Sequence, residues 1–176
     1  KWIRIKTAKQ NEKIYLMMLK VIFSIFLLFS ITSYSYSAGT ADTGSKSEYD
    51  KAANLIKTAK KYESKGKIKK AKKRYEKALK LLIKSNKKKP NQANTLNYLG
   101  FATRKLGDYE QGEKYYLQGL KIEPNHKGIN EYLGELYVAT NRMELAKERL
   151  NVLKNCNCEE YKELKEIIDG KKQSKY

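Results

Sequence analysis

The two cysteines of the chain, Cys156 and Cys158, are one residue apart in the segment KNCNCEEYKELKEI. Thiols at this spacing could bind a metal ion, exchange disulfides or bond to each other. Two thiolates cannot complete a tetrahedral zinc site, which takes four ligands. The C-x-C spacing also differs from the C-x-x-C motif of redox proteins. Two interpretations remain: a local disulfide, which requires a turn because residues i and i+2 diverge on a helix, or two separate thiols.

The other residues offer few signs of catalysis. The single histidine, His126, follows Glu-Pro-Asn, which favours a role in a turn or a helix cap. The sequence contains no P-loop, no H-E-x-x-H zinc motif, no G-x-S-x-G nucleophile motif and no dinucleotide-binding fingerprint. We therefore predict a protein that is not an enzyme and that has no cofactor and no metal.

The positive charge is concentrated in one segment. The chain carries 38 Lys and Arg against 19 Asp and Glu. Between Lys46 and Pro90 there are 18 basic and 4 acidic residues, a net charge of +14, whereas residues 91–176 carry a net +1. Only 5 of the 38 are Arg, the residue that reads phosphate and guanine by paired hydrogen bonds, so a nucleic-acid partner is disfavoured. Either a solvated lysine-rich helix face or an anionic partner of Lys60–Lys89 would explain the excess.

The first fifty residues have the pattern of an export signal. A start at Met17 or Met18 would give a short region ending in Lys20, followed by the 11-residue apolar run Val21–Ile31. That run is too short to span a bilayer as a helix, which takes about 20 residues. We expect an upstream extension at 1–16, a signal peptide at 17–41 and a flexible linker at 42–50. The protein would then be exported, most simply to a periplasm, or anchored in the membrane if the segment is not cleaved. An oxidising compartment favours the disulfide.

The rest of the chain has a 34-residue period. NYLG ends at Gly100 and EYLG ends at Gly134, and the prolines Pro90 and Pro124 share the spacing. The repeated positions are Leu55, Thr58, Ala59, Tyr62, Ala71, Tyr75 and Ala78; then Leu96, Leu99, Gly100, Thr103, Gly112, Tyr116 and Pro124; then Asn130, Leu133, Gly134, Tyr137, Ala146 and Leu150. This pattern resembles the tetratricopeptide repeat, the TPR family. A narrower similarity points to small exported repeat proteins of Gram-negative, especially alphaproteobacterial, organisms.

The resemblance implies an all-α solenoid of helical hairpins. We place a divergent first repeat at 51–90, a second at 93–126, a third at 127–158, a capping helix at 159–170 and a basic tail at 171–176. The late Pro90 predicts a second helix in the first repeat that continues to about Lys87 without a break near Ile83. The cysteines fall at the junction between the third repeat and the capping helix, where we favour a structural disulfide.

The resemblance also implies a non-enzymatic scaffold that binds a protein or a peptide on its concave face. The positions expected to be exposed there are Ile56, Lys60, Glu63, Asn94, Asn97, Phe101, Arg104, Glu131, Glu135 and Val138. Family members that grip a C-terminal carboxylate use a Lys/Asn/Asn/Lys/Arg set, and of the matching positions only Lys60 has a fitting charge, so we reject that clamp. The alternatives are an envelope adaptor whose lysines bind anionic lipid or polymer, and a minor thiol-redox protein.

Overall fold

The structure, a computed structural model, describes residues 17–18 and 46–173. Residues 1–45 and 46–176 form separate units, and the helices below all belong to the second. The expected extension at 1–16 and all but Met17 and Met18 of the expected signal peptide lie outside the described residues, as do the last three residues of the basic tail. Within the described residues, no helix has the length and apolarity needed to cross a membrane.

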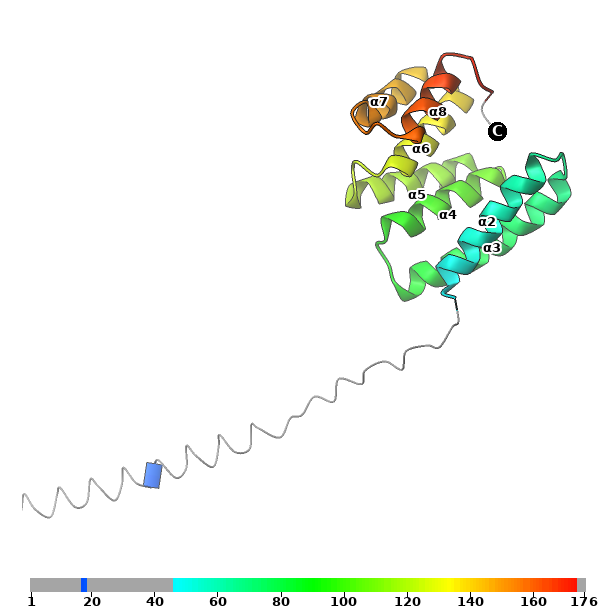
Figure 1. Cartoon of the computed structure of the whole chain (residues 1–176). Coiled ribbons are helices and arrows are strands. Elements are labelled where there is room, and N and C mark those ends of the chain that lie inside the picture. Colours follow the sequence, from blue (N-terminus) through cyan, green and yellow to red (C-terminus); the bar gives the residue numbers. More distant parts are fainter. Residues whose placement is uncertain (1–16, 19–45, 174–176) are drawn as a thin grey trace, which may run out of the picture. The chain divides into compact units, whose positions relative to one another are not determined.

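The described part of residues 46–176 consists of α-helices joined by short turns, with no strand. The helices are α2 (Glu48–Glu63), α3 (Ile68–Lys88), α4 (Ala93–Lys105), α5 (Tyr109–Ile122), α6 (Lys127–Ala139), α7 (Met143–Leu153) and α8 (Glu159–Ile168). Helices α2 and α3, α4 and α5, and α6 and α7 pair as three successive hairpins, and α8 packs on α6 and α7 (Figure 1). The all-α class implied by the resemblance is confirmed for the described residues.

Helix α2 begins earlier than the sequence analysis placed it. The Ser47 side chain accepts a hydrogen bond from the backbone N–H of Asp50 at 3.1 Å and so caps the helix. Glu48 and Asp50 lie in the first turn, where carboxylates complement the helix dipole. Residues 48–50, assigned above to the linker, are therefore helical.

The turns between the paired helices use residues that tolerate a left-handed backbone. Gly66, Gly107 and Asn141 follow the first helix of the three hairpins, with φ of 66°, 100° and 57°. Glycine has no Cβ to clash in this region, and asparagine tolerates it better than other residues. The three turns therefore end their helices by the same device at equivalent places in the period.

Helix α3 is the longest helix of the described residues. It has 21 residues without interruption at Ile83, whereas its counterparts α5 and α7 have 14 and 11. Ala71, Tyr75, Ala78 and Leu82 form its buried stripe. The residues beyond Leu82 extend the helix toward Pro90, whose ring fixes the turn into α4.

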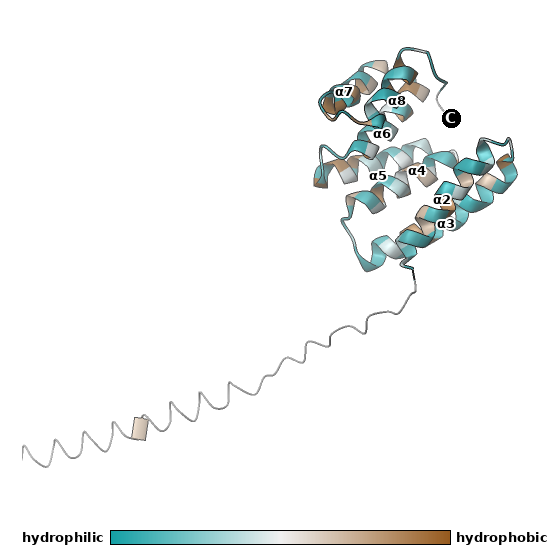
Figure 2. Cartoon of the chain, viewed as in Figure 1, coloured by the Kyte–Doolittle hydropathy of each residue, from teal (hydrophilic) through white to brown (hydrophobic). Residues whose placement is uncertain are grey.

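Small residues allow the helices to pack closely. A Cβ on Gly100 of α4 would lie 2.6 Å from the ring of Tyr116 in α5, and one on Gly134 of α6 would lie 2.5 Å from Leu164 of α8. Tyr116 and Leu164 are both completely buried. Each helix from α2 to α8 contributes buried apolar residues to the core, and Figure 2 shows hydrophobic residues interspersed with hydrophilic ones along the helices.

A disulfide closes the turn before α8. Cys156 and Cys158 are joined by a disulfide with Cα atoms 5.2 Å apart. Asn157 between them has a φ of 45°, so the chain reverses here rather than continuing as a helix. After α8, Gly170 adopts a φ of 69° and Lys172 forms an ion pair with Glu163. The described start of the basic tail therefore folds back on α8.

Candidate functional site

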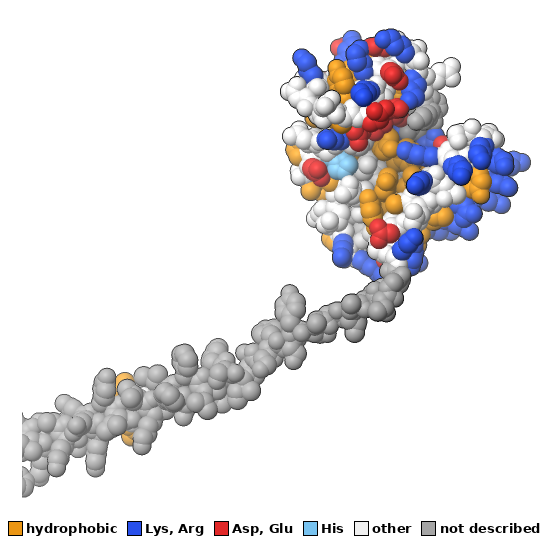
Figure 3. All heavy atoms as spheres, viewed as in Figure 1, with side chains coloured by type: hydrophobic (Ala, Val, Ile, Leu, Met, Phe, Trp, Pro, Cys, Tyr) orange, Lys and Arg blue, Asp and Glu red, His pale blue; other side chains and the backbone are white. Residues whose placement is uncertain are grey.

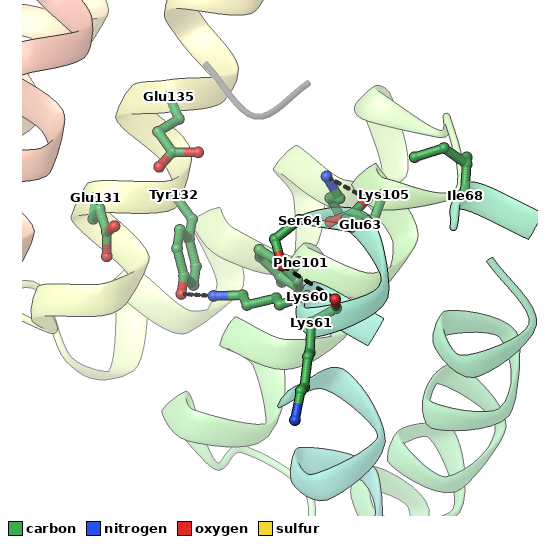
Figure 4. Close-up of a pocket in the computed structure, with 10 residues that line it drawn as sticks. All are labelled: Lys60, Lys61, Glu63, Ser64, Ile68, Phe101, Lys105, Glu131, Tyr132 and Glu135. Atoms are coloured by element: carbon green, nitrogen blue, oxygen red, sulfur yellow. Dashed lines mark hydrogen bonds and ion pairs between the residues drawn. The ribbon is translucent and has the colours of Figure 1, made fainter. Parts of the chain in front are cut away.

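A groove lies between the first helices of the three hairpins. Its main hollow has a volume of about 680 Å³ and is lined from α2, α4 and α6, with Ser64 and Ile68 contributing from the turn after α2 and the start of α3. The lining side chains are Lys60, Lys61, Glu63, Ser64, Ile68, Phe101, Lys105, Glu131, Tyr132 and Glu135 (Figure 4). Because each repeat contributes one inner helix, stacking the hairpins brings residues far apart in sequence to one surface.

Aromatic rings and one lysine form the centre of the groove. The ring centroids of Phe101 and Tyr132 are 4.8 Å apart. The Lys60 ammonium lies 4.5 Å from the Phe101 centroid and 4.9 Å from the Tyr132 centroid, within the range of a cation–π contact. It also donates a hydrogen bond of 2.8 Å to the Tyr132 hydroxyl. Lys60 therefore links α2 to α6 across the groove (Figure 4).

The α6 side of the groove is acidic. Glu131 is half-buried, and burial raises its pKa to about 8, with the nearby carboxylates of Glu135, Glu160 and Glu163 adding to the shift and Lys60 opposing it. A group with this pKa is largely neutral at pH 7 and ionises when a cation comes close. The site is therefore suited to a positively charged group.

A second hollow continues the groove past Tyr132. Its volume is about 430 Å³, and it shares Glu131 and Tyr132 with the first. Glu160 of α8 and Lys127 of α6 also line it. The two hollows together form a surface that passes from α2 over Tyr132 to α8.

The α2 end of the groove is held by Glu63. Its carboxylate pairs with Lys105 of α4 at 2.8 Å and accepts a hydrogen bond of 2.8 Å from the Tyr75 hydroxyl of α3. Burial, together with this acceptor, raises the pKa of Tyr75 above its ordinary value. Glu63 thus ties three helices together at the rim of the groove, and its role there is in part structural.

Several residues predicted to be exposed on the concave face are buried. Arg104 and Glu135 are 1% and 3% exposed, Phe101 is 3% exposed, and Asn97 and Ile56 are buried as well. Arg104 donates hydrogen bonds to the Tyr132 carbonyl oxygen at 2.5 Å and to Glu135 at 3.2 Å. The prediction of exposure was wrong here because neighbouring inner helices lie close enough to cover one another's central positions. Phe101 and Glu135 line the main hollow and Asn97 lines the second one, whereas Ile56 and Arg104 line neither.

The remaining predicted residues are accessible to different degrees. Lys60 and Asn94 are exposed, whereas Glu63, Glu131 and Val138 are half-buried. Asn94 lies outside the main hollow, where its side-chain oxygen is 3.0 Å from His126 Nε2. His126 caps α6, because its Nδ1 accepts a hydrogen bond from the Ile129 N–H at 3.1 Å, so Nε2 donates to Asn94. Of the ten positions predicted to be exposed on the concave face, the main hollow contains Lys60, Glu63, Phe101, Glu131 and Glu135.

The sequence analysis did not name five residues of the hollow as binding residues, namely Lys61, Ser64, Ile68, Lys105 and Tyr132. Tyr132 is adjacent to Glu131 in the sequence, and a search limited to one stripe of each helix leaves it out. Ser64 lies in the turn after α2 and Ile68 begins α3, a stretch that the repeat pattern treats only as a connection. A prediction that also counted the helix positions next to the inner stripe would have included Lys61 and Lys105.

The groove combines charged side chains with aromatic rings. Its titratable groups are lysines, carboxylates and a tyrosine whose pKa burial raises above the ordinary value. Within the described residues, no three His, Cys, Asp or Glu side chains gather where they could hold a metal ion. The cysteines are outside the groove and bonded to each other.

The comparisons with known proteins concern the same helices. Residues 93–126 match the family model described as Tetratricopeptide repeat, over the range predicted above for the second repeat. No curated protein matches the chain.

Three solved structures are similar to the chain at low identity. The first TPR of Spaghetti (RPAP3) bound to the HSP90 peptide SRMEEVD is 21% identical over 72% of this chain and 98% of that chain, with a TM-score of 0.49. The Yersinia enterocolitica type III secretion translocator chaperone SycD is 18% identical over 69% and 81%, with a TM-score of 0.49. The first TPR domain of human RPAP3 is 18% identical over 69% and 94%, with the same score. Residues 93–126, which hold α4 and α5, match the tetratricopeptide-repeat model, and the helical hairpins α2–α3 and α6–α7 precede and follow them along the chain.

Proposed function

We propose that the protein is a non-enzymatic scaffold that binds an extended segment of another protein in the groove between α2, α4 and α6. The observation that carries this proposal is the hollow of about 680 Å³ to which the first helix of every hairpin contributes side chains. A surface assembled from all three hairpins exists only when the array is stacked, as expected for a binding surface of a repeat protein.

The chemistry of the groove favours a segment with a basic side chain. Glu131 lies between the two hollows and has carboxylates of α6 and α8 near it. A lysine or arginine of the partner would meet this acidic wall, while Phe101 and Tyr132 would contact apolar and main-chain groups beside it. A hydrogen bond to a charged group contributes roughly 1.5–3 kcal/mol, so this contact would dominate the selection.

The proposal includes export of the protein. The apolar run Val21–Ile31 after Lys20 is typical of a secretory signal. A disulfide between Cys156 and Cys158 suits an oxidising compartment such as a periplasm. The partner would then be another protein of the same compartment. Detection of the chain in a periplasmic extract with its leader removed would support this part, and a reduced protein in the cytoplasm would contradict it.

A peptide-selection experiment tests the binding function. Random eight-residue peptides are selected on the full chain, and the dissociation constants of the selected peptides are measured by fluorescence anisotropy. We expect the selected peptides to contain a Lys or an Arg. Glu131→Gln should raise their dissociation constants at least about tenfold, because it removes the carboxylate that meets the cation. The affinity of the unmodified chain should rise between about pH 6.5 and 8.5, as Glu131 ionises near its pKa of about 8.

The matched control is Glu76→Gln, which removes an exposed carboxylate of α3 that lines neither hollow of the groove. It should leave the dissociation constant and its pH dependence unchanged. Binding at the acidic wall would be contradicted if the selected peptides lacked a basic residue. It would also be contradicted if they lost affinity equally in both variants. Failure to select any peptide that competes for one site would contradict the scaffold itself.

A further inference from the structure

Helix α3 has a face formed almost entirely of lysines. Six exposed lysines follow one another at spacings of three and four residues: Lys69, Lys73, Lys77, Lys80, Lys84 and Lys87. At 100° per residue these positions fall within an arc of about 80°, on the side opposite the buried stripe of the helix. We refer to them as the lysine face. Figure 3 shows Lys and Arg gathered over the α2–α3 hairpin, and Asp and Glu near α6 and α8.

The lysine face is not neutralised from within the described residues. None of its six ammonium groups forms an ion pair there, and Glu76 is the single acidic residue of α3. The acidic residues of α2 point elsewhere. Glu48 pairs with Lys88, Glu63 pairs with Lys105, and Asp50 accepts a hydrogen bond from Ser47.

The geometry of the face suits a flat anionic partner. From Lys69 to Lys87 it extends about 27 Å along one straight helix, at 1.5 Å per residue. Ile83, 50% exposed, lies beside Lys80, Lys84 and Lys87 and adds a large apolar side chain to the same region. Lysine carries a point charge and lacks the paired donors with which arginine forms two hydrogen bonds to a phosphate or a base. The face therefore favours non-specific electrostatic attraction over a specific nucleic-acid contact.

We propose that the lysine face docks the protein on an anionic lipid surface, independently of the groove. The six ammonium groups would lie at the level of the headgroups, and Ile83 would enter the interface beside them. Each lysine near such a surface contributes about fivefold to the partition coefficient, so several together give firm but salt-sensitive binding. The groove is lined mainly by α2, α4 and α6, with only Ile68 at the start of α3, so it would remain open to its own partner.

A vesicle assay tests this proposal with the full chain. Partition by sedimentation is measured on phosphatidylcholine vesicles with and without about 30% phosphatidylglycerol, an anionic lipid. The ratio of the two partition coefficients isolates the electrostatic contribution to membrane binding, because any contribution of the apolar run Val21–Ile31 enters both coefficients and cancels. The ratio should fall about hundredfold in Lys73→Gln/Lys80→Gln/Lys84→Gln, at about fivefold per lysine, and should approach one at high salt.

The matched control neutralises three exposed lysines of the other hairpins, Lys121→Gln/Lys127→Gln/Lys154→Gln, none of which forms an ion pair within the described residues. This triple variant should keep the ratio of the unmodified chain. No preference for anionic vesicles, or an equal loss in both triple variants, would overturn the proposal. Tighter binding of a DNA duplex than of anionic vesicles at the same salt, lost in the first triple variant, would also overturn it and assign the face to nucleic acid.

Discussion

At the scale of single residues, Arg104 is a cation with almost no access to solvent. Its guanidinium contacts the Tyr132 carbonyl oxygen and the Glu135 carboxylate, both on α6, while Arg104 itself belongs to α4. The side chains of the ion pair are 0% and 4% exposed. Arg104 therefore joins the second hairpin to the third, directly beneath the groove, and it shapes the site without facing a partner.

Replacing Arg104 should strongly destabilise the fold. Arg104→Met removes the guanidinium that pairs with Glu135 inside the fold, and the loss of one partner of a buried ion pair costs about 3–5 kcal/mol in the free energy of unfolding. Urea denaturation measures the loss. In the double variant Arg104→Met/Glu135→Leu much of the stability should return, because the buried carboxylate is removed together with the guanidinium that pairs with it.

Arg74→Met is the matched control, since Arg74 on α3 is half-buried and has no ion pair among the described residues. It should change the free energy of unfolding by no more than about 0.5 kcal/mol. A loss below about 1 kcal/mol in Arg104→Met would mean that the guanidinium does not hold the two hairpins together.

The residue types of the groove were predictable, but their exposure was not. The 34-residue period places Lys60, Phe101 and Glu131 on the inner stripe of successive first helices, and these three residues line the groove. Burial depends on how closely α4 and α6 approach, which is a property of three-dimensional packing. A pattern within one helix carries no information about it, and for this reason Arg104 and Glu135 were wrongly expected to be exposed.

At the scale of elements, local signals determined most of the helix boundaries. Positive-φ positions at Gly66, Gly107 and Asn141 end the first helices, and Pro90 and Pro124 follow the second helices of the first two hairpins. The boundary missed at the start of α2 depends on the Ser47 cap. That signal was present in the sequence but stood beside a Gly/Ser/Thr-rich segment that indicated a linker.

Close packing between the paired helices depends on glycine at the contact. Gly100→Ala would place a Cβ 2.6 Å from the ring of Tyr116, which is rigid and fully buried. Overpacking of this kind should lower the free energy of unfolding by about 1–3 kcal/mol, despite the better helix propensity of alanine. Thermal and urea denaturation would measure the loss.

Gly134→Ala provides the comparison, because its new Cβ would meet the terminal methyl groups of Leu164 in the last helix. Those methyl groups can rotate away, so a smaller loss is expected than in Gly100→Ala. Equal stability of Gly100→Ala and the unmodified chain would show that the ring of Tyr116 can move, and that the contact does not set the distance between α4 and α5.

At the scale of residues 46–176, two surfaces of different chemistry coexist. The groove uses inner helices, aromatic rings and an acidic wall, whereas the lysine face uses the outer helix of the first hairpin. The uneven charge was visible in the sequence as a net +14 between Lys46 and Pro90. The folded arrangement adds that the six lysines share one side of α3, which is why a single helix could act as a docking surface while the groove binds elsewhere.

The most direct test of the central claim is to map a selected peptide onto the chain by NMR titration. Binding in the groove predicts chemical-shift changes at the backbone amides of Lys60, Phe101 and Tyr132, which come from α2, α4 and α6. The amides of Lys73 and Lys84 on the lysine face should not shift. Changes confined to α3, α5 and α7, with the three groove residues unaffected, would contradict the account.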